Sequence, residues 1–119
     1  MHDWDHAEEF AARAEQLLAL GRGLEAEQSL RQAIEIDPRH GRARNNLGVL
    51  LMNQGDVDGA GAEFLKAIEI DPQFAKAHNN LGTLLKNKGD RDGAEAEYLK
   101  ATEIDPCPVD AHYSLGLLL

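Results

Sequence analysis

The sequence predicts an all-α solenoid in which three helix–turn–helix hairpins are followed by one further helix. Two observations predict this fold. The tetrapeptide Glu-Ile-Asp-Pro occurs three times at intervals of 34 residues, starting at Glu35, Glu69 and Glu103. The run Asn-Asn-Leu-Gly at residues 45–48 returns one period later at residues 79–82. A fixed period of this length is typical of arrays in which each unit buries its apolar face against its neighbours.

Residues 41–74 show the plan of one unit. The first half has apolar or small residues at the spacing of one helical face: Leu47, Gly48, Leu50 and Leu51. The second half has another such stripe: Val57, Ala60, Phe64, Ala67 and Ile68. Gly55 separates the two stripes, as glycine does just past a helix end, and Asp71-Pro72 closes the second one. We therefore expect two antiparallel helices joined by short turns.

The other units follow the same plan. In residues 75–108 we expect a first helix to about Lys88 and a second helix that ends near Ile104. Residues 7–40 form a unit with a looser first helix, and residues 109–119 are the opening of a fourth unit. We interpret residues 1–119 as a single domain.

Small residues recur where the helices of a hairpin must approach closely. One repeat position holds Gly48 and Gly82, and two others hold only alanine: Ala26, Ala60, Ala94, Ala33, Ala67 and Ala101. Between the two alanines of each unit lies one large residue: Leu30, Phe64 or Tyr98. A large side chain that faces small ones is what interdigitated helix packing needs.

These residues resemble the tetratricopeptide repeat, whose pattern has a leucine–glycine pair, two alanines, an aromatic residue and a proline at fixed positions. Two units fill these places, with Leu47, Gly48, Ala60, Phe64, Ala67 and Pro72 and with Leu81, Gly82, Ala94, Tyr98, Ala101 and Pro106. Their Asn-Leu-Gly version is similar to the repeats of O-linked N-acetylglucosamine transferase and of many bacterial scaffolds. The resemblance covers residues 7–119. It implies a right-handed superhelix in which the first helix of each hairpin lines a concave groove.

The sequence departs from this pattern at three places. Leucine replaces the second aromatic residue expected in the first helices, at Leu17, Leu51, Leu85 and Leu119. The large aromatic residue expected near the start of each unit is replaced by Arg44, His78 and His112 in the later units. Arg13 stands in the first unit where leucine is expected. We interpret this atypical first unit as a terminal cap, whose outer face meets water.

Composition excludes several classes of partner. The net charge is −9 and the isoelectric point is near 4.9, which disfavours binding to nucleic acids and to anionic membranes. No stretch approaches the roughly 20 apolar residues that a membrane-spanning helix needs. The first residues show no basic and then apolar run, so we expect no signal peptide and a cytoplasmic location. The single cysteine, Cys107, excludes an internal disulfide.

The predicted groove is rich in amides and cations although the chain is acidic. The residues of the first helices that share its face in units two and three are Arg42, Asn45, Asn46, Val49, Asn53, Lys76, Asn79, Asn80, Thr83, Lys86 and Asn87. Amides offer both a donor and an acceptor, which suits the backbone of an extended peptide. In the transferase-like relatives, asparagines matching Asn46 and Asn80 grip a peptide main chain. We therefore expect an extended or short helical peptide, and the cations favour an acidic one.

Other interpretations of this face stay open. One alternative is that the asparagines keep the concave surface hydrated. Another is that they reflect repeat duplication without selection for binding. A clamp for a terminal carboxylate, as in chaperone-binding members of the family, is matched here only by Asn46 and Lys76. Glu15 lies within that set and would repel a carboxylate.

The sequence predicts a non-catalytic protein-interaction module. No nucleophile–base pair and no glycine-rich phosphate loop stands out, so we expect no catalytic residue, no metal and no cofactor. One alternative is a self-assembly scaffold, in which the last helix joins chains into a homo-oligomer through Leu115, Leu118 and Leu119. Another is that the chain is a fragment of a longer repeat array.

Overall fold

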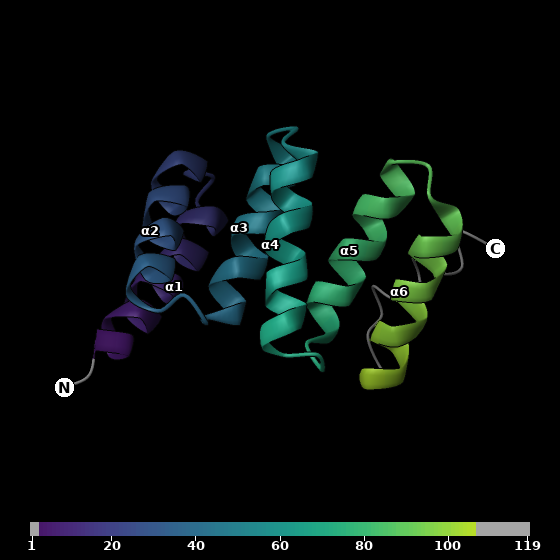
Figure 1. Ribbon diagram of the computed structural model, residues 1–119. Coiled ribbons are helices and arrows are strands. Elements are labelled where there is room, and N and C mark those ends of the chain that lie inside the picture. The colour runs from purple at the N-terminus through teal and green to yellow at the C-terminus, as the bar shows by residue number, and fades with distance from the viewer. Residues whose placement is uncertain (1–2, 107–119) are drawn as a thin grey trace.

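The computed structural model describes residues 3–106 and contains six helices and no strand in that range. They are α1 (Asp3–Ala19), α2 (Gly23–Ile36), α3 (Gly41–Asn53), α4 (Val57–Ile70), α5 (Ala75–Asn87) and α6 (Arg91–Ile104). Figure 1 shows them as three successive hairpins along an elongated body of 47 × 27 × 23 Å. The predicted all-α solenoid is confirmed. The helix expected at residues 109–119, with Leu115, Leu118 and Leu119, lies outside the described residues.

The array is curved, with one helix of each hairpin on its inner side. Within a hairpin, α1 packs on α2, α3 on α4 and α5 on α6. Helix α3 also contacts both α1 and α5, whereas the described second helices α2, α4 and α6 do not contact one another. Because the first helices lie closer together than the second ones, the solenoid bends toward α1, α3 and α5. We call the surface along these three helices the inner face.

A Gly-Asp pair ends the first helix and starts the second one in two of the hairpins. Gly55 and Gly89 have φ angles of 88° and 90°, in the left-handed region that glycine adopts without strain. The next residue then caps the following helix, because Asp56 Oδ1 accepts from the Gly59 N–H at 3.0 Å and Asp90 Oδ1 from the Gly93 N–H at 2.9 Å. The turn predicted at Gly55 is confirmed, and so is the end of the third unit's first helix near Lys88.

The Asp-Pro pairs have a structural role. Asp37 and Asp71 are the C-caps of α2 and α4. Each side chain accepts a hydrogen bond from the backbone two residues later, at 3.1 Å from the Arg39 N–H and at 3.0 Å from the Gln73 N–H. This local bond holds the backbone in the turn that leads into the next hairpin.

Polar side chains replace the family's aromatic residue at the start of the first helices. Arg44 donates to the Pro38 carbonyl at 3.1 Å and to Glu63 on α4 at 3.1 Å. One period later, His78 is 5% exposed, with Nε2 2.9 Å from the Pro72 carbonyl and Nδ1 2.7 Å from Glu97. Both residues therefore tie the turn before a hairpin to that hairpin's second helix.

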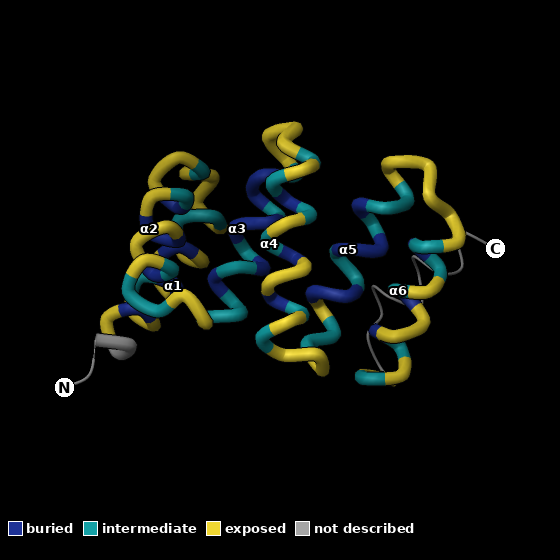
Figure 2. The backbone as a smooth tube through the Cα atoms, in the orientation of Figure 1, coloured by how far each residue is buried: buried dark blue, intermediate teal, exposed yellow. Residues whose placement is uncertain are grey.

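The core runs between the helices of each hairpin and from one hairpin to the next, as the buried positions in Figure 2 show. Its largest side chains are Leu30, Phe64 and Tyr98, each fully buried. A Cβ atom added at Gly48 would lie 2.5 Å from the Phe64 ring, and one at Gly82 would lie 2.7 Å from the Tyr98 ring. Glycine is therefore required where each aromatic ring crosses the first helix.

The first hairpin differs at its outer end. Arg13 is exposed, although the same repeat position holds the buried residues Leu47 and Leu81 in the next two hairpins. Those leucines have a preceding hairpin to pack on, and the described residues provide none for Arg13.

Gly48→Ala is expected to destabilise the protein by about 1–3 kcal/mol, because the methyl group overlaps the buried ring of Phe64. Gly61→Ala is the matched control. Gly61 also lies inside a helix, but a Cβ there would be 4.0 Å from its nearest contact, Leu84, so this variant is expected to gain about 0.5–1 kcal/mol. Urea unfolding monitored by circular dichroism measures both. Equal stabilisation of the two variants would contradict the close approach.

Candidate functional site

The residues predicted to share one face lie on α3 and α5, and the structure brings most of them to the inner face. On α3 they are Arg42, Asn45, Asn46, Val49 and Asn53, and on α5 they are Lys76, Asn79, Asn80, Thr83, Lys86 and Asn87. Their exposure differs widely. Asn53, Lys76 and Asn87 are exposed, whereas Asn45 is only 3% exposed. The shared helical face therefore does not make these residues equally available to a partner.

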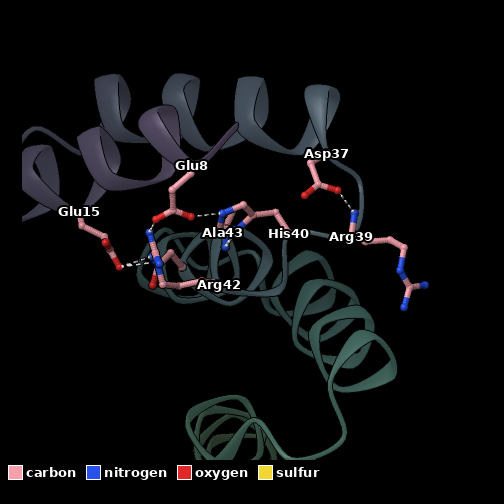
Figure 3. A network of polar contacts seen from close by, with 8 residues as sticks. Glu8, Glu15, Asp37, Arg39, His40, Arg42 and Ala43 are labelled. Carbon is pink, nitrogen blue, oxygen red and sulfur yellow. Dashed lines mark hydrogen bonds and ion pairs between the residues drawn. The ribbon is translucent and has the colours of Figure 1, made fainter. Parts of the chain in front are cut away.

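Two carboxylates of α1 hold Arg42, as Figure 3 shows. The Arg42 guanidinium donates through Nη2 to Glu8 Oε1, and its Nε lies 3.2 Å from Glu15 Oε2. Glu8 and Arg42 occupy the same repeat position in successive hairpins. Their charges are opposite, so the bond also joins the first hairpin to the second.

His40 completes this cluster from the N-terminus of α3. Its Nδ1 accepts from the Ala43 N–H at 3.1 Å and so caps the helix. Since Nδ1 accepts, the proton lies on Nε2, which donates to Glu8 Oε2 at 2.8 Å. The hydrogen bonds from Arg42 and then from His40 lower the pKa of Glu8 below its ordinary value of 4.5. Glu8 is thus an anion throughout the neutral pH range.

Amide side chains join successive first helices. Asn46 on α3 donates to Glu15 on α1 at 3.2 Å, and Asn80 on α5 donates to Asn45 on α3 at 2.9 Å. The prediction that Asn45 faces an open groove is wrong, because its amide oxygen lies between α3 and α5, where Asn80 reaches it. Helical spacing identifies the side of a helix and not how deeply a side chain is covered by the next repeat.

The hydroxyl of Thr83 is used inside the third hairpin. Its Oγ1 lies 2.9 Å from the Tyr98 hydroxyl and donates to the Asn79 carbonyl within α5 or to that hydroxyl. In the second hairpin the same two positions hold Val49 and Phe64. Threonine thus accompanies tyrosine, and valine accompanies phenylalanine. Comparison of these two positions between units is the sequence signal that would have revealed the pairing.

The polar groups that stay available lie mainly on α5. Among the described residues, Lys76 and Lys86 form no ion pair. The buried Oδ1 of Asn79 likewise has no hydrogen-bond partner there. Leaving such a buried acceptor unpaired is costly.

Within residues 3–106 no group of three or more His, Cys, Asp or Glu side chains is placed to hold a metal ion. None of the six helices is long and apolar enough to cross a membrane.

Thr83→Val is expected to cost about 1–3 kcal/mol, because it removes the partner of the buried Tyr98 hydroxyl. Thr83→Val with Tyr98→Phe recreates the Val49–Phe64 pair of the preceding hairpin. The double variant is expected to recover most of that loss, since both polar groups leave together. Chemical denaturation of the wild type, the two single variants and the double variant closes the cycle. A double variant as unstable as the sum of the single ones would show that the two hydroxyls do not interact.

Comparison with known proteins identifies the repeat. A sequence model described as tetratricopeptide repeat matches residues 11–75, which is more than half of the chain, and a second model with the same description matches residues 63–96. No protein of curated function matches the sequence significantly.

Solved structures resemble the whole described array. The Thermobaculum terrenum O-GlcNAc transferase (mutant K341M) matches with 25% identity and a TM-score of 0.94 over 100% of this chain and 23% of its own. YrrB, a tetratricopeptide repeat protein with an unusual peptide-binding site, shares 28% identity and a TM-score of 0.81 over 92% of this chain and 56% of its own. The first repeat domain of Spaghetti (RPAP3), solved with the HSP90 peptide SRMEEVD, shares 16% identity and a TM-score of 0.91 over 98% and 93%. With the family's pattern present in its hairpins and matched by the family's own sequence model, the chain belongs to the tetratricopeptide repeat family.

Proposed function

We propose that this chain is a non-catalytic module that binds an extended or short helical peptide, rich in acidic residues, on its inner face. Two structural relatives support a peptide partner, since the RPAP3 domain was solved with an HSP90 peptide and YrrB has an unusual peptide-binding site. The first helices carry the polar groups that a peptide needs, and they lie on the inner side of the bend.

The single observation that carries this proposal is that polar and charged side chains of α5 lack partners among the described residues. Lys76 and Lys86 have no counter-ion among the described residues, and the Asn79 amide oxygen has no donor there. An extended peptide presents a backbone N–H at every second residue on one side, and acidic side chains provide the missing counter-ions. One acidic peptide therefore provides both the N–H donors for the amide and the counter-ions for the lysines.

The proposed site is narrower than the predicted set. Arg42, Asn45, Asn80 and Thr83 already have partners within the protein, so we assign binding mainly to Lys76, Asn79, Lys86 and Asn87. Asn46, Val49 and Asn53 on α3 form its edge. Asn46 and Asn80 also join neighbouring hairpins, which makes them poor choices for a test that must leave stability unchanged.

The other parts of the proposal rest on charge and side-chain chemistry. The net charge of −9 supports a protein partner over a nucleic acid or an anionic membrane. The groups proposed to contact the peptide are amides, which bind its main chain, and lysines, which bind its carboxylates. They include no nucleophile–base pair, so the proposed module is non-catalytic.

Lys76→Ala with Lys86→Ala is expected to weaken the binding of acidic peptides selected from a random library by about tenfold or more, because it removes both available cations. Fluorescence anisotropy with the labelled selected peptides measures the affinity. The matched control is Lys66→Ala with Lys100→Ala, which changes the net charge equally on the exposed side of α4 and α6. The control is expected to stay within about twofold of the wild type. A larger loss in the control than in the inner-face variant would place the binding surface elsewhere.

A further inference from the structure

We propose that Glu8 and Glu15 divide the inner face into two sections and direct the acidic part of a bound peptide to α5. This inference rests on the proposed function, because it specifies where on that face the charges of the ligand lie. The first section consists of α1 and α3, and the second section consists of α5.

In the first section, acidic side chains of the protein already pair with the arginine that a ligand would bind. Arg42 contacts both Glu8 and Glu15, and His40 caps α3 and lies within hydrogen-bond distance of Glu8. Around Arg42, two carboxylates thus face one guanidinium. The side chains of Glu8 and Glu15 are 54% and 45% exposed, so an incoming carboxylate would meet them directly. Repulsion between these two carboxylates and the carboxylate of a ligand disfavours binding here.

Glu15 also engages the amide that a peptide backbone would need. The Asn46 amide donates to Glu15, whereas its counterpart one period later, Asn80, donates to the neutral Asn45. Arg42 and Asn46 of α3 are therefore both bonded to carboxylates of α1. In the first section, Glu8 and Glu15 thus take the positions that the carboxylates of an acidic ligand would take.

The second section lacks such internal acids. Lys76 occupies on α5 the repeat position that Arg42 occupies on α3. The positions of the preceding helix that would pair with it are those of Glu8 and Glu15, and on α3 they hold Arg42 and Val49. Neither is an acid, which explains why Lys76 has no ion-pair partner among the described residues. With Lys86, the second section is the cationic part of the inner face.

The partner that fits both sections is a peptide whose acidic residues are clustered at one end. That end lies over α5, and the neutral or basic remainder crosses α3 and α1. Packed helices are about 8–10 Å apart, and an extended chain advances about 3.3 Å per residue, so about six to eight residues cross the three helices.

The test measures binding of a labelled peptide of about eight alternating Glu and Gly residues. Glu8→Gln with Glu15→Gln keeps the shape of both side chains and frees the charge of Arg42. We expect this variant to bind the peptide about tenfold more tightly than the wild type, because Arg42 becomes available in addition to Lys76 and Lys86 and two repulsive charges are lost. The matched control is Glu9→Gln with Glu25→Gln, which makes the same change in net charge at two exposed acids that do not contact Arg42. This control is expected to change the affinity by about twofold at most.

The outcomes separate this inference from the proposed function. Wild-type binding that depends on Lys76 and Lys86, with no gain in the Glu8 and Glu15 variant, would overturn the inference and leave the proposed function standing. Binding by that variant alone would support the inference and contradict the proposed function of the wild type. Failure of both proteins to bind would overturn both, and an equal gain in the control would reduce the effect to net charge. Thermal melting verifies folding, and Glu15→Gln alone, which leaves the Glu8 bonds intact, is expected to give about a threefold gain.

Discussion

The structure depends on the close packing of one large side chain against a glycine in the facing helix. Phe64 and Tyr98 are fully buried, and each ring lies where Gly48 or Gly82 has no side chain. This contact brings the two helices of a hairpin together and leaves little freedom in how they cross. Because the same contact recurs after one period, the hairpins are alike and the first helices of the array line up along one side.

The alignment of the first helices gives the inner face its properties. Residues at one repeat position in successive hairpins become neighbours, so Glu8 meets Arg42 although 34 residues separate them. The same geometry brings Asn80 to Asn45. The bonds between repeats and the surface for a partner therefore draw on the same side chains. A residue committed to one role is less available for the other, and this competition makes α3 different from α5.

Most of the fold could be predicted from the sequence because its signals are local and repeated. The glycine turns, the Asp-Pro turns and the positions of Phe64 and Tyr98 each depend on a few neighbouring residues. The candidate site was predicted less well. Helical spacing placed Asn45 and Arg42 on one side of α3, but their availability depends on Asn80, Glu8 and Glu15 in the adjacent hairpins. Opposite charges at one repeat position, as in Glu8 and Arg42, are the signal that could have revealed this contact. The hydrogen bonds of His78 could not be predicted from the sequence, because its partners are a backbone carbonyl and a residue of another helix.

An acidic peptide is expected to bind this protein on α5, because the acids of α1 neutralise Arg42 on α3. Titration of the isotope-labelled protein with an acidic peptide, followed by amide NMR shifts, tests this most directly. The largest shift changes are expected along Ala75–Asn87, the span of α5, and small ones along α1. The largest changes on α2, α4 and α6, or around Glu8 and Arg42, would contradict it.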